Sequence, residues 1–256
     1  MEGYAGGVLV RDEKVPQGPT EGTPVLVCFP SAGLASTIVA HYVVRAKELP
    51  RCATFQSPLL PSATVVIDSL PNPPVRACGD SHVAVVVSEF PAPMPLVTPL
   101  AISILHWVQS RRAGPVVAVE GILHRQEDGE QTQEEDTILG IPSNAAMKDR
   151  LKGAKIKLLE EGVVGGIPAD LLNEASAQGQ DAAVLFVTAH SADYPDHRAA
   201  ARLLETLDRL LPSLELDPKP LMVQAEVIEK ALREGMKFHK EPPKTEAPAR
   251  EIEMFQ

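Results

Sequence analysis

The sequence has 256 residues, 44% of them hydrophobic and 23% charged, and its 34 acidic and 24 basic residues give a formal net charge of −10. This composition predicts a globular protein, and one large α/β domain is the commoner arrangement at this length. The negative charge disfavours a nucleic-acid partner, because the longest basic run is only Arg111-Arg112. The most apolar stretch, residues 96–108, is also shorter than the ~20 residues that a membrane span needs.

The three cysteines, Cys28, Cys52 and Cys78, form no CxxC pair and are odd in number. Their spacing therefore predicts neither a zinc site nor a disulfide framework, and it fits a reducing compartment. The N-terminus carries no basic region followed by an apolar stretch, as a signal peptide would. We expect a cytoplasmic protein with no metal and no cofactor.

The first half of the chain alternates short apolar runs with one long helical pattern. After a leader rich in glycine and proline, residues 25–29 predict a strand, residues 30–33 a turn and residues 34–49 a helix. Further strands are predicted at 52–55, 64–70, 76–79 and 82–88, all in one sheet. The last of these, HVAVVVS, is typical of a strand buried on both faces.

The second half predicts a helix at 96–112 and a buried strand at 115–123. Residues 125–136 carry six carboxylates and one arginine, which indicates a solvated loop. Ser143 is expected to cap a helix at 144–151, and helices at 167–178, 196–211 and 219–236 surround a strand at 182–188. Residues 237–256, rich in proline, lysine and glutamate, predict a flexible tail.

Strands that alternate with helices of ten or more residues predict a largely parallel sheet that helices cover on both faces. The expected fold class is therefore α/β, with three layers and a mostly parallel sheet flanked by helices. We expect residues 1–236 to form a single domain and residues 237–256 to lie outside it.

Two segments could form a ligand cleft at the carboxyl ends of the strands. Ser31 and Gly33 lie in a turn between a strand and a helix, where a phosphate loop would lie, but serines replace two glycines of the GxGxxG pattern. His190, Asp193 and His197 follow the strand at 182–188. The neighbouring Asp196 has a simpler role as the N-cap of the next helix.

The spacing pairs no nucleophile with a base and an orienting acid, so no catalytic residue is predicted. Glu89, after the strand at 82–88, could be a general base or an acid at the end of a strand. His41 and His106 lie within apolar helices and are expected to be packed histidines.

Four segments in order resemble the archaeal members of the proteasome assembly chaperone family, over about residues 20–235. They are FPSAGLASTIVAHYVV (29–44), GIPSNAAMKDRL (140–151), GVVGGIPADLL (162–172) and LFVTAHSADYPDHRAAARLLETL (185–207). The family pattern has more glycine at the first turn, where this chain has Ala35 and Ser36. The resemblance implies a fold similar to nucleoside phosphorylases, a homo-oligomer larger than a dimer, and a non-enzymatic scaffold on proteasome α-subunits.

The last residues, Met254-Phe255-Gln256, are similar to the hydrophobic, tyrosine, any-residue tail of proteasome activators, with Phe255 in place of the tyrosine. Such a tail docks when a lysine or a backbone nest captures its carboxylate and an apolar slot takes the side chains before it. We expect these three residues to dock onto proteasome α-subunits. The alternative is a nucleoside- or nucleotide-binding enzyme of phosphorylase-like fold that uses residues 31–36 and 190–197.

Overall fold

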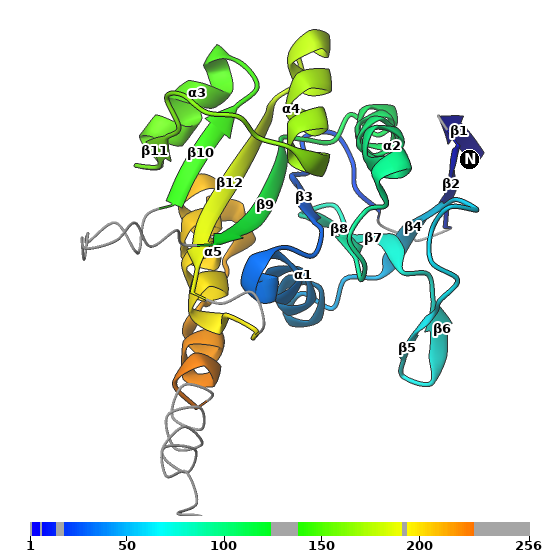
Figure 1. The fold of residues 1–256 in the computed structure, drawn as a ribbon, viewed down its shortest axis with the longest axis horizontal. Helices are drawn as coiled ribbons and strands as arrows, with labels where there is room; N and C mark the ends of the chain where they lie inside the picture. The colour runs from blue at the N-terminus through cyan, green and yellow to red at the C-terminus, as the bar shows by residue number, and fades with distance from the viewer. Residues whose placement is uncertain (1, 6, 14–17, 124–137, 191–193, 228–256) are drawn as a thin grey trace, which may run out of the picture.

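Four parallel strands form the centre of the structure, a computed structural model that describes residues 2–5, 7–13, 18–123, 138–190 and 194–227. In sheet order they are β8 (Ala84–Ser88), β3 (Val25–Cys28), β9 (Val116–Leu123) and β12 (Ala182–Ala189) (Figure 1). All residues of β3 and β8 are buried. Their valine-rich sequences suit this position, since both faces of a parallel sheet are covered.

Further strands extend the sheet on both sides. Beyond β8 lie β7 (Val75–Gly79), β4 (Arg51–Gln56), β2 (Val8–Asp12) and β1 (Glu2–Ala5), each antiparallel to its neighbour. Beyond β12 lie β10 (Ile138–Pro142), antiparallel to β12, and the short β11 (Lys157–Leu158), parallel to β10. The order is β1-β2-β4-β7-β8-β3-β9-β12-β10-β11.

Helices cover both faces of this sheet (Figure 1). One face carries α1 (Ala35–Ala46), α3 (Ala145–Gly153) and α5 (His197–Leu210), and the other α2 (Val97–Ser110) and α4 (Gly166–Gln178). Single-turn 3-10 helices lie at Ala32–Leu34 (η1), Met94–Leu96 (η2) and Pro212–Leu214 (η4), and residues 219–227 are helical.

The two faces divide the core because side chains alternate along each strand. In β3, Leu26 and Cys28 join the core under α1 and α5, whereas Val25 and Val27 join the core under α2 and α4. The predicted three-layer α/β fold is confirmed, with the parallel strands at the centre of a mixed sheet.

The prediction that residues 64–70 form a strand of this sheet is wrong. They contribute to a separate two-stranded hairpin of β5 (Val65–Ile67) and β6 (Leu70–Asn72), which projects from the body (Figure 1). The loop residues Asp68 and Ser69 both have positive φ, 50° and 62°, as a two-residue hairpin turn of type I′ requires. Proline at 71, 73 and 74 removes backbone donors that a strand of the main sheet would need.

Other local expectations also differ from the structure. The glycine-rich leader contains β1 and β2, and β10 and β11 were not predicted. Ser143 does not cap α3: its Oγ accepts a hydrogen bond from Ala182 N (2.9 Å) and donates to Gln180 O (2.8 Å). The N-cap is Asn144, whose Oδ1 accepts from Met147 N (2.9 Å).

The predicted acidic loop at 125–136 and the predicted tail at 237–256 lie outside the described residues. The three cysteines are free and buried. Within the described ranges, every helix is too short or too polar to cross a membrane.

Asp12, at the end of β2, anchors the N-terminal strands to α2. Its Oδ1 accepts hydrogen bonds from Trp107 Nε1 (3.1 Å) and Arg111 Nη2 (2.5 Å). The Arg111 guanidinium also lies 5.1 Å from the centre of the Trp107 ring, within the range of a cation–π interaction. Trp107 itself is 4% exposed and contacts Phe55 edge-on. The Asp12 carboxylate therefore accepts the hydrogen bond of a buried indole N–H and also pairs with the charge of Arg111.

We predict that Asp12→Ala lowers the free energy of unfolding by about 2 kcal/mol, because it leaves the indole N–H without its acceptor and removes an ion pair. Urea denaturation measures the loss. The control is Glu21→Ala, whose ion pair with Arg112 is 78–81% exposed and is expected to contribute less than about 0.5 kcal/mol. Equal losses in the two variants would contradict the anchoring role of Asp12.

Candidate functional site

The turn from Phe29 to Ser36 crosses the end of β9. Ser31 Oγ accepts a hydrogen bond from Gly121 N (2.8 Å) and lies 2.8 Å from Ser36 Oγ, which in turn donates to Phe29 O. A Cβ atom on Gly121 would lie 2.1 Å from Ala32 O, so only glycine allows the turn this close to β9. The hydroxyls that a phosphate loop would offer to a ligand instead hold the turn to the strand.

The same turn contacts the loop between β12 and α5. Asp196 N donates to Gly33 O (2.7 Å), and Asp196 Oδ1 accepts from Ala199 N (2.8 Å). Asp196 Oδ2 accepts from His190 N (3.0 Å) and lies 3.1 Å from His190 Nδ1. Burial raises the pKa of Asp196, but the hydrogen bonds from Ala199 and His190 outweigh it and hold the pKa below its usual value. The predicted N-cap role of Asp196 is confirmed.

The structure therefore brings the two predicted segments together. Ser31 and Gly33 lie in one turn, and Asp196 joins that turn to His190. His197 is the first residue of α5, and its buried Nδ1 makes no hydrogen bond to any described residue. Asp193 lies outside the described residues. No group of three or more His, Cys, Asp or Glu side chains in the described part of the chain could hold a metal ion.

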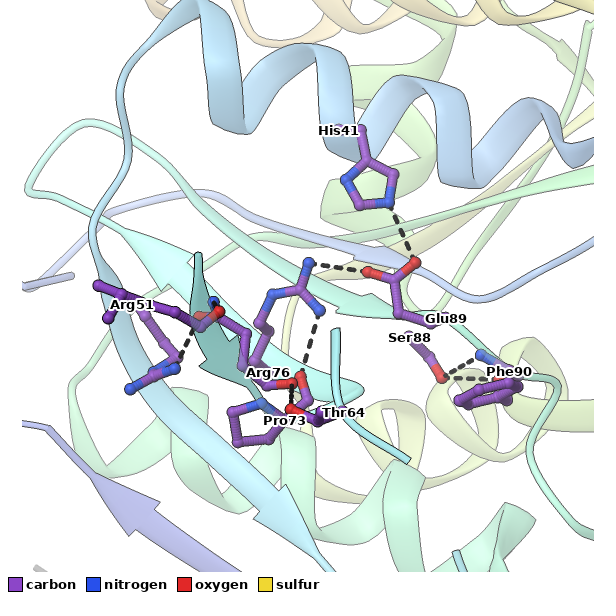
Figure 2. Close-up of polar contacts among 10 residues, drawn as sticks. His41, Arg51, Thr64, Pro73, Arg76, Ser88, Glu89 and Phe90 are labelled. Atoms are coloured by element: carbon purple, nitrogen blue, oxygen red, sulfur yellow. Dashed lines mark hydrogen bonds and ion pairs between the residues drawn. The ribbon is translucent and has the colours of Figure 1, made fainter. Parts of the chain in front are cut away.

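A second polar cluster joins α1 to the sheet and is shown in Figure 2. Glu89 follows β8; its Oε1 accepts from Arg76 Nη2 (2.8 Å), and its Oε2 lies 3.2 Å from Nε2 of His41 on α1. Arg76, on β7, is 2% exposed and also donates from Nη1 to Pro73 O (3.2 Å). His41, expected to be packed, is partly exposed and makes this polar contact, and the expectation for His106 is wrong because its side chain is exposed on α2.

Both carboxylate oxygens of Glu89 contact basic side chains, so Glu89 links α1 to β7 and is not positioned as a general base. We call this set of contacts the Glu89 tie. Burial raises the pKa of Glu89, but hydrogen bonds and charge from His41 and Arg76 outweigh it and hold the pKa below its ordinary value. The sequence signal for this tie is an arginine within the otherwise apolar run VRACG. Sequence reasoning alone did not pair it with Glu89.

Glu120 is a further titratable group that sequence reasoning missed. It lies in β9 opposite Phe186 of β12, on the face that packs under α2 and α4. Burial raises its pKa to about 7. A carboxyl group with this pKa exchanges a proton near neutral pH. Its signal in the sequence is the single acid within the run VVAVEGIL.

A sheet with a parallel centre and helices on both faces defines a three-layer α/β protein. Within this class, the chain belongs to the PAC2 family, whose model matches residues 25–236. It is also 25% identical over 219 residues to the uncharacterized protein MJ0106 of Methanocaldococcus jannaschii, which covers 86% of this chain and 87% of that protein.

Solved structures show the same architecture. PbaA of Pyrococcus furiosus, an archaeal homolog of proteasome-assembly chaperone, superposes with a TM-score of 0.78 at 24% identity, covering 90% of this chain and 94% of PbaA. A second PbaA structure is 25% identical, with a TM-score of 0.74 over 90% of this chain and 96% of PbaA. PbaB of the same organism, an archaeal proteasome activator, superposes with a TM-score of 0.73 at 17% identity, covering 90% of this chain and 99% of PbaB. These findings confirm the family resemblance and the fold.

We predict that Glu89→Ala lowers the free energy of unfolding by about 3 kcal/mol, because the buried Arg76 guanidinium loses its counter-ion. Urea denaturation at pH 7 measures the loss, and His41→Ala, which removes a partly exposed partner, costs less than about 1 kcal/mol. Since Glu89 has a lowered pKa, its contribution is full above about pH 4.5 and disappears as the pH falls through the lowered value. A loss of less than 1 kcal/mol for Glu89→Ala would contradict the tie.

The contribution of Glu120 to stability changes with pH in the opposite direction to that of Glu89. The folded protein binds the proton of the Glu120 carboxyl more tightly than the unfolded chain does. The contribution of this group to the free energy of unfolding is therefore full below about pH 4.5 and is lost as the pH rises to about 7. Glu120→Gln therefore stabilises the protein by about 1–2 kcal/mol at pH 8 and has little effect at pH 4. Thermal or urea unfolding across this range tests it, with the exposed Glu161→Gln as control. A Glu120→Gln effect independent of pH would refute the buried-carboxyl explanation.

Proposed function

We propose that this protein is a non-enzymatic proteasome assembly chaperone or adaptor of the cytoplasm, a homo-oligomeric scaffold that docks its C-terminal residues onto proteasome α-subunits. The observation that carries the proposal is the PAC2 family match over residues 25–236. The 25% identity with PbaA, spread over 90% of this chain, supports it, since PbaA is a homolog of a proteasome-assembly chaperone.

The polar groups at the carboxyl ends of the strands also favour a scaffold over a nucleoside-binding enzyme. Ser31 and Ser36 bond to each other and to backbone groups, and Asp196 caps α5 while it holds His190. These groups join loops that come from distant parts of the chain. In an enzyme, polar groups at such an edge would be aimed at one substrate position rather than at neighbouring loops. These hydrogen bonds fix the positions of the loops at this edge of the sheet.

The β5–β6 hairpin region adds an apolar surface that suits a protein partner. Leu59, Val66 and Leu70 are exposed by 58%, 67% and 66%. Arg51 holds the base of the hairpin, because its Nη1 donates to Asn72 Oδ1 (2.7 Å). Exposed apolar side chains grouped on a projecting element are typical of surfaces that bind other proteins.

Met254, Phe255 and Gln256 are the residues that we propose to dock. A methionine and an aromatic ring fill an apolar slot, and a lysine or backbone amides take a terminal carboxylate. The 29 residues after residue 227 span at most roughly 100 Å when extended, which allows contact with a facing ring of α-subunits. A three-residue anchor binds weakly, but several anchors on one oligomer act together at an effective concentration near the millimolar range.

We predict that deletion of residues 254–256 abolishes co-purification with the 20S proteasome of the same organism. Phe255→Ala is expected to weaken binding at least tenfold, because it empties the apolar slot. Phe255→Tyr is expected to bind at least as well as the wild type, since the added hydroxyl can contribute one hydrogen bond of about 0.5–1.5 kcal/mol. Surface plasmon resonance on immobilised 20S particles measures all three.

Glu253→Ala is the matched control and should bind as the wild type does. Light scattering should give the same mass, larger than a dimer, for every variant, because the body carries self-association. Wild-type affinity in the deletion variant would assign the interface to the body, and a monomeric mass at micromolar concentration would refute the scaffold.

A further inference from the structure

Four basic side chains line a pocket between α5 and the edge of the sheet. Its volume is about 310 Å³. The charged and polar residues that line it are Lys155, Lys157, Arg202, Glu205, Thr206 and Arg209. Four cations and one carboxylate give the pocket a formal charge of +3, whereas the chain as a whole has a charge of −10. A local excess of positive charge in an acidic protein selects for anions, because the rest of the surface repels them.

The spacing along α5 places three of these side chains on one face. Arg202, Thr206 and Arg209 are separated by four and three residues, which is one helical turn each time. On the opposite wall, Lys155 and Lys157 alternate with Ile156, which is 6% exposed and belongs to the core. Lys155 lines the pocket from the turn after α3, where its φ is 58°, and Lys157 lines it from β11, so cations reach the pocket from both walls.

Hydrogen bonds orient the arginines. Arg202 is half-buried, and its Nη2 donates to Thr188 O (2.8 Å) at the end of β12. Arg209 Nη2 donates to Thr206 Oγ1 (3.0 Å), and Thr206 is 2% exposed. Burial lowers the pKa of Arg202, and the neighbouring Glu205 carboxylate offsets this only in part, which means that the charge of Arg202 is costly in these surroundings. An anion in the pocket would offset that cost.

We propose that this pocket binds a small polyanion, a molecule with two or more phosphate or carboxylate groups. Guanidinium groups contact such groups through paired donors, and lysine ammonium groups add charge from the other wall. The volume is at the lower end of the range for small-molecule sites, about 300–1,000 Å³, so it suits a compact ligand rather than a folded partner. The proposal is independent of the C-terminal docking residues.

Isothermal titration calorimetry of the full chain at low salt tests the site, with inorganic pyrophosphate and citrate as probes for the phosphate and carboxylate sources. Saturable one-to-one binding per chain is expected for at least one probe, and the affinity should fall as salt is added. The double variant Lys157→Glu/Arg209→Glu changes two exposed side chains and makes the pocket charge −1, so it should weaken binding at least tenfold. Lys148→Glu, an exposed lysine of α3 that does not line the pocket, should change the affinity less than twofold.

If the double variant does not fold by circular dichroism, Lys155→Ala/Lys157→Ala replaces it, with a loss of at least fivefold expected. Absence of saturable binding of both probes at millimolar concentration would overturn the proposal. So would an equal loss in Lys148→Glu, or hexaglutamate binding more than tenfold more tightly than either probe, which would assign the pocket to an acidic peptide. Whichever of pyrophosphate and citrate binds with higher affinity identifies the anion as a phosphate or a carboxylate.

Discussion

The burial of four parallel strands on both faces is the constraint on which the rest of the structure depends. Parallel neighbours cannot be joined by tight turns, so the chain returns along helices, and these cover the two faces. Because β8, β3, β9 and β12 run in the same direction, their carboxyl ends meet at one edge. The turn at 29–36, Glu89 and Asp196 lie at this edge for that reason. Packing of the strands thus decides which polar groups become neighbours.

The polar groups gathered there bind the elements to one another. Glu89 links α1 to β7, Asp196 links the first turn to α5, and Ser31 links that turn to β9. Each bond joins elements that the chain reaches at separate points in the sequence. Such bonds define the relative positions of helices and loops. A rigid body with fixed surfaces is what the proposed scaffold function requires.

Prediction from the sequence succeeded where one local signal was sufficient. The valine-rich runs at 82–88 and 115–123 identified buried strands, and Asp196 before an amphipathic segment identified an N-cap. It failed where neighbours decide the structure: β11 has two residues, and β1 and β2 are held by pairing with each other and with β4. The hairpin at 65–72 has strand-like residues but leaves the sheet, because its turn and prolines govern its pairing.

The candidate functional groups also divide into those with a local signal in the sequence and those that depend on neighbouring elements. Ser31, Gly33 and His190 could be proposed from their positions after strands, and the structure brings them together through Asp196. The pairing of Arg76 with His41 through Glu89 depends on three elements and has no local pattern. The basic pocket likewise combines α5 with an edge segment about 50 residues earlier, and only the fold places those cations together.

The position of β3 has a consequence for synthesis of the chain. Val25 begins the first central strand, yet it pairs with Ala84 on one side and Val116 on the other. The ribosome must therefore make residues 84–88 before β3 gains one neighbour and residues 116–119 before it gains the second. Contacts this far apart in sequence slow folding, since long loops must close first. The apolar segment VLVC thus spends the early part of translation without its partners, when a nascent chain is most exposed to aggregation.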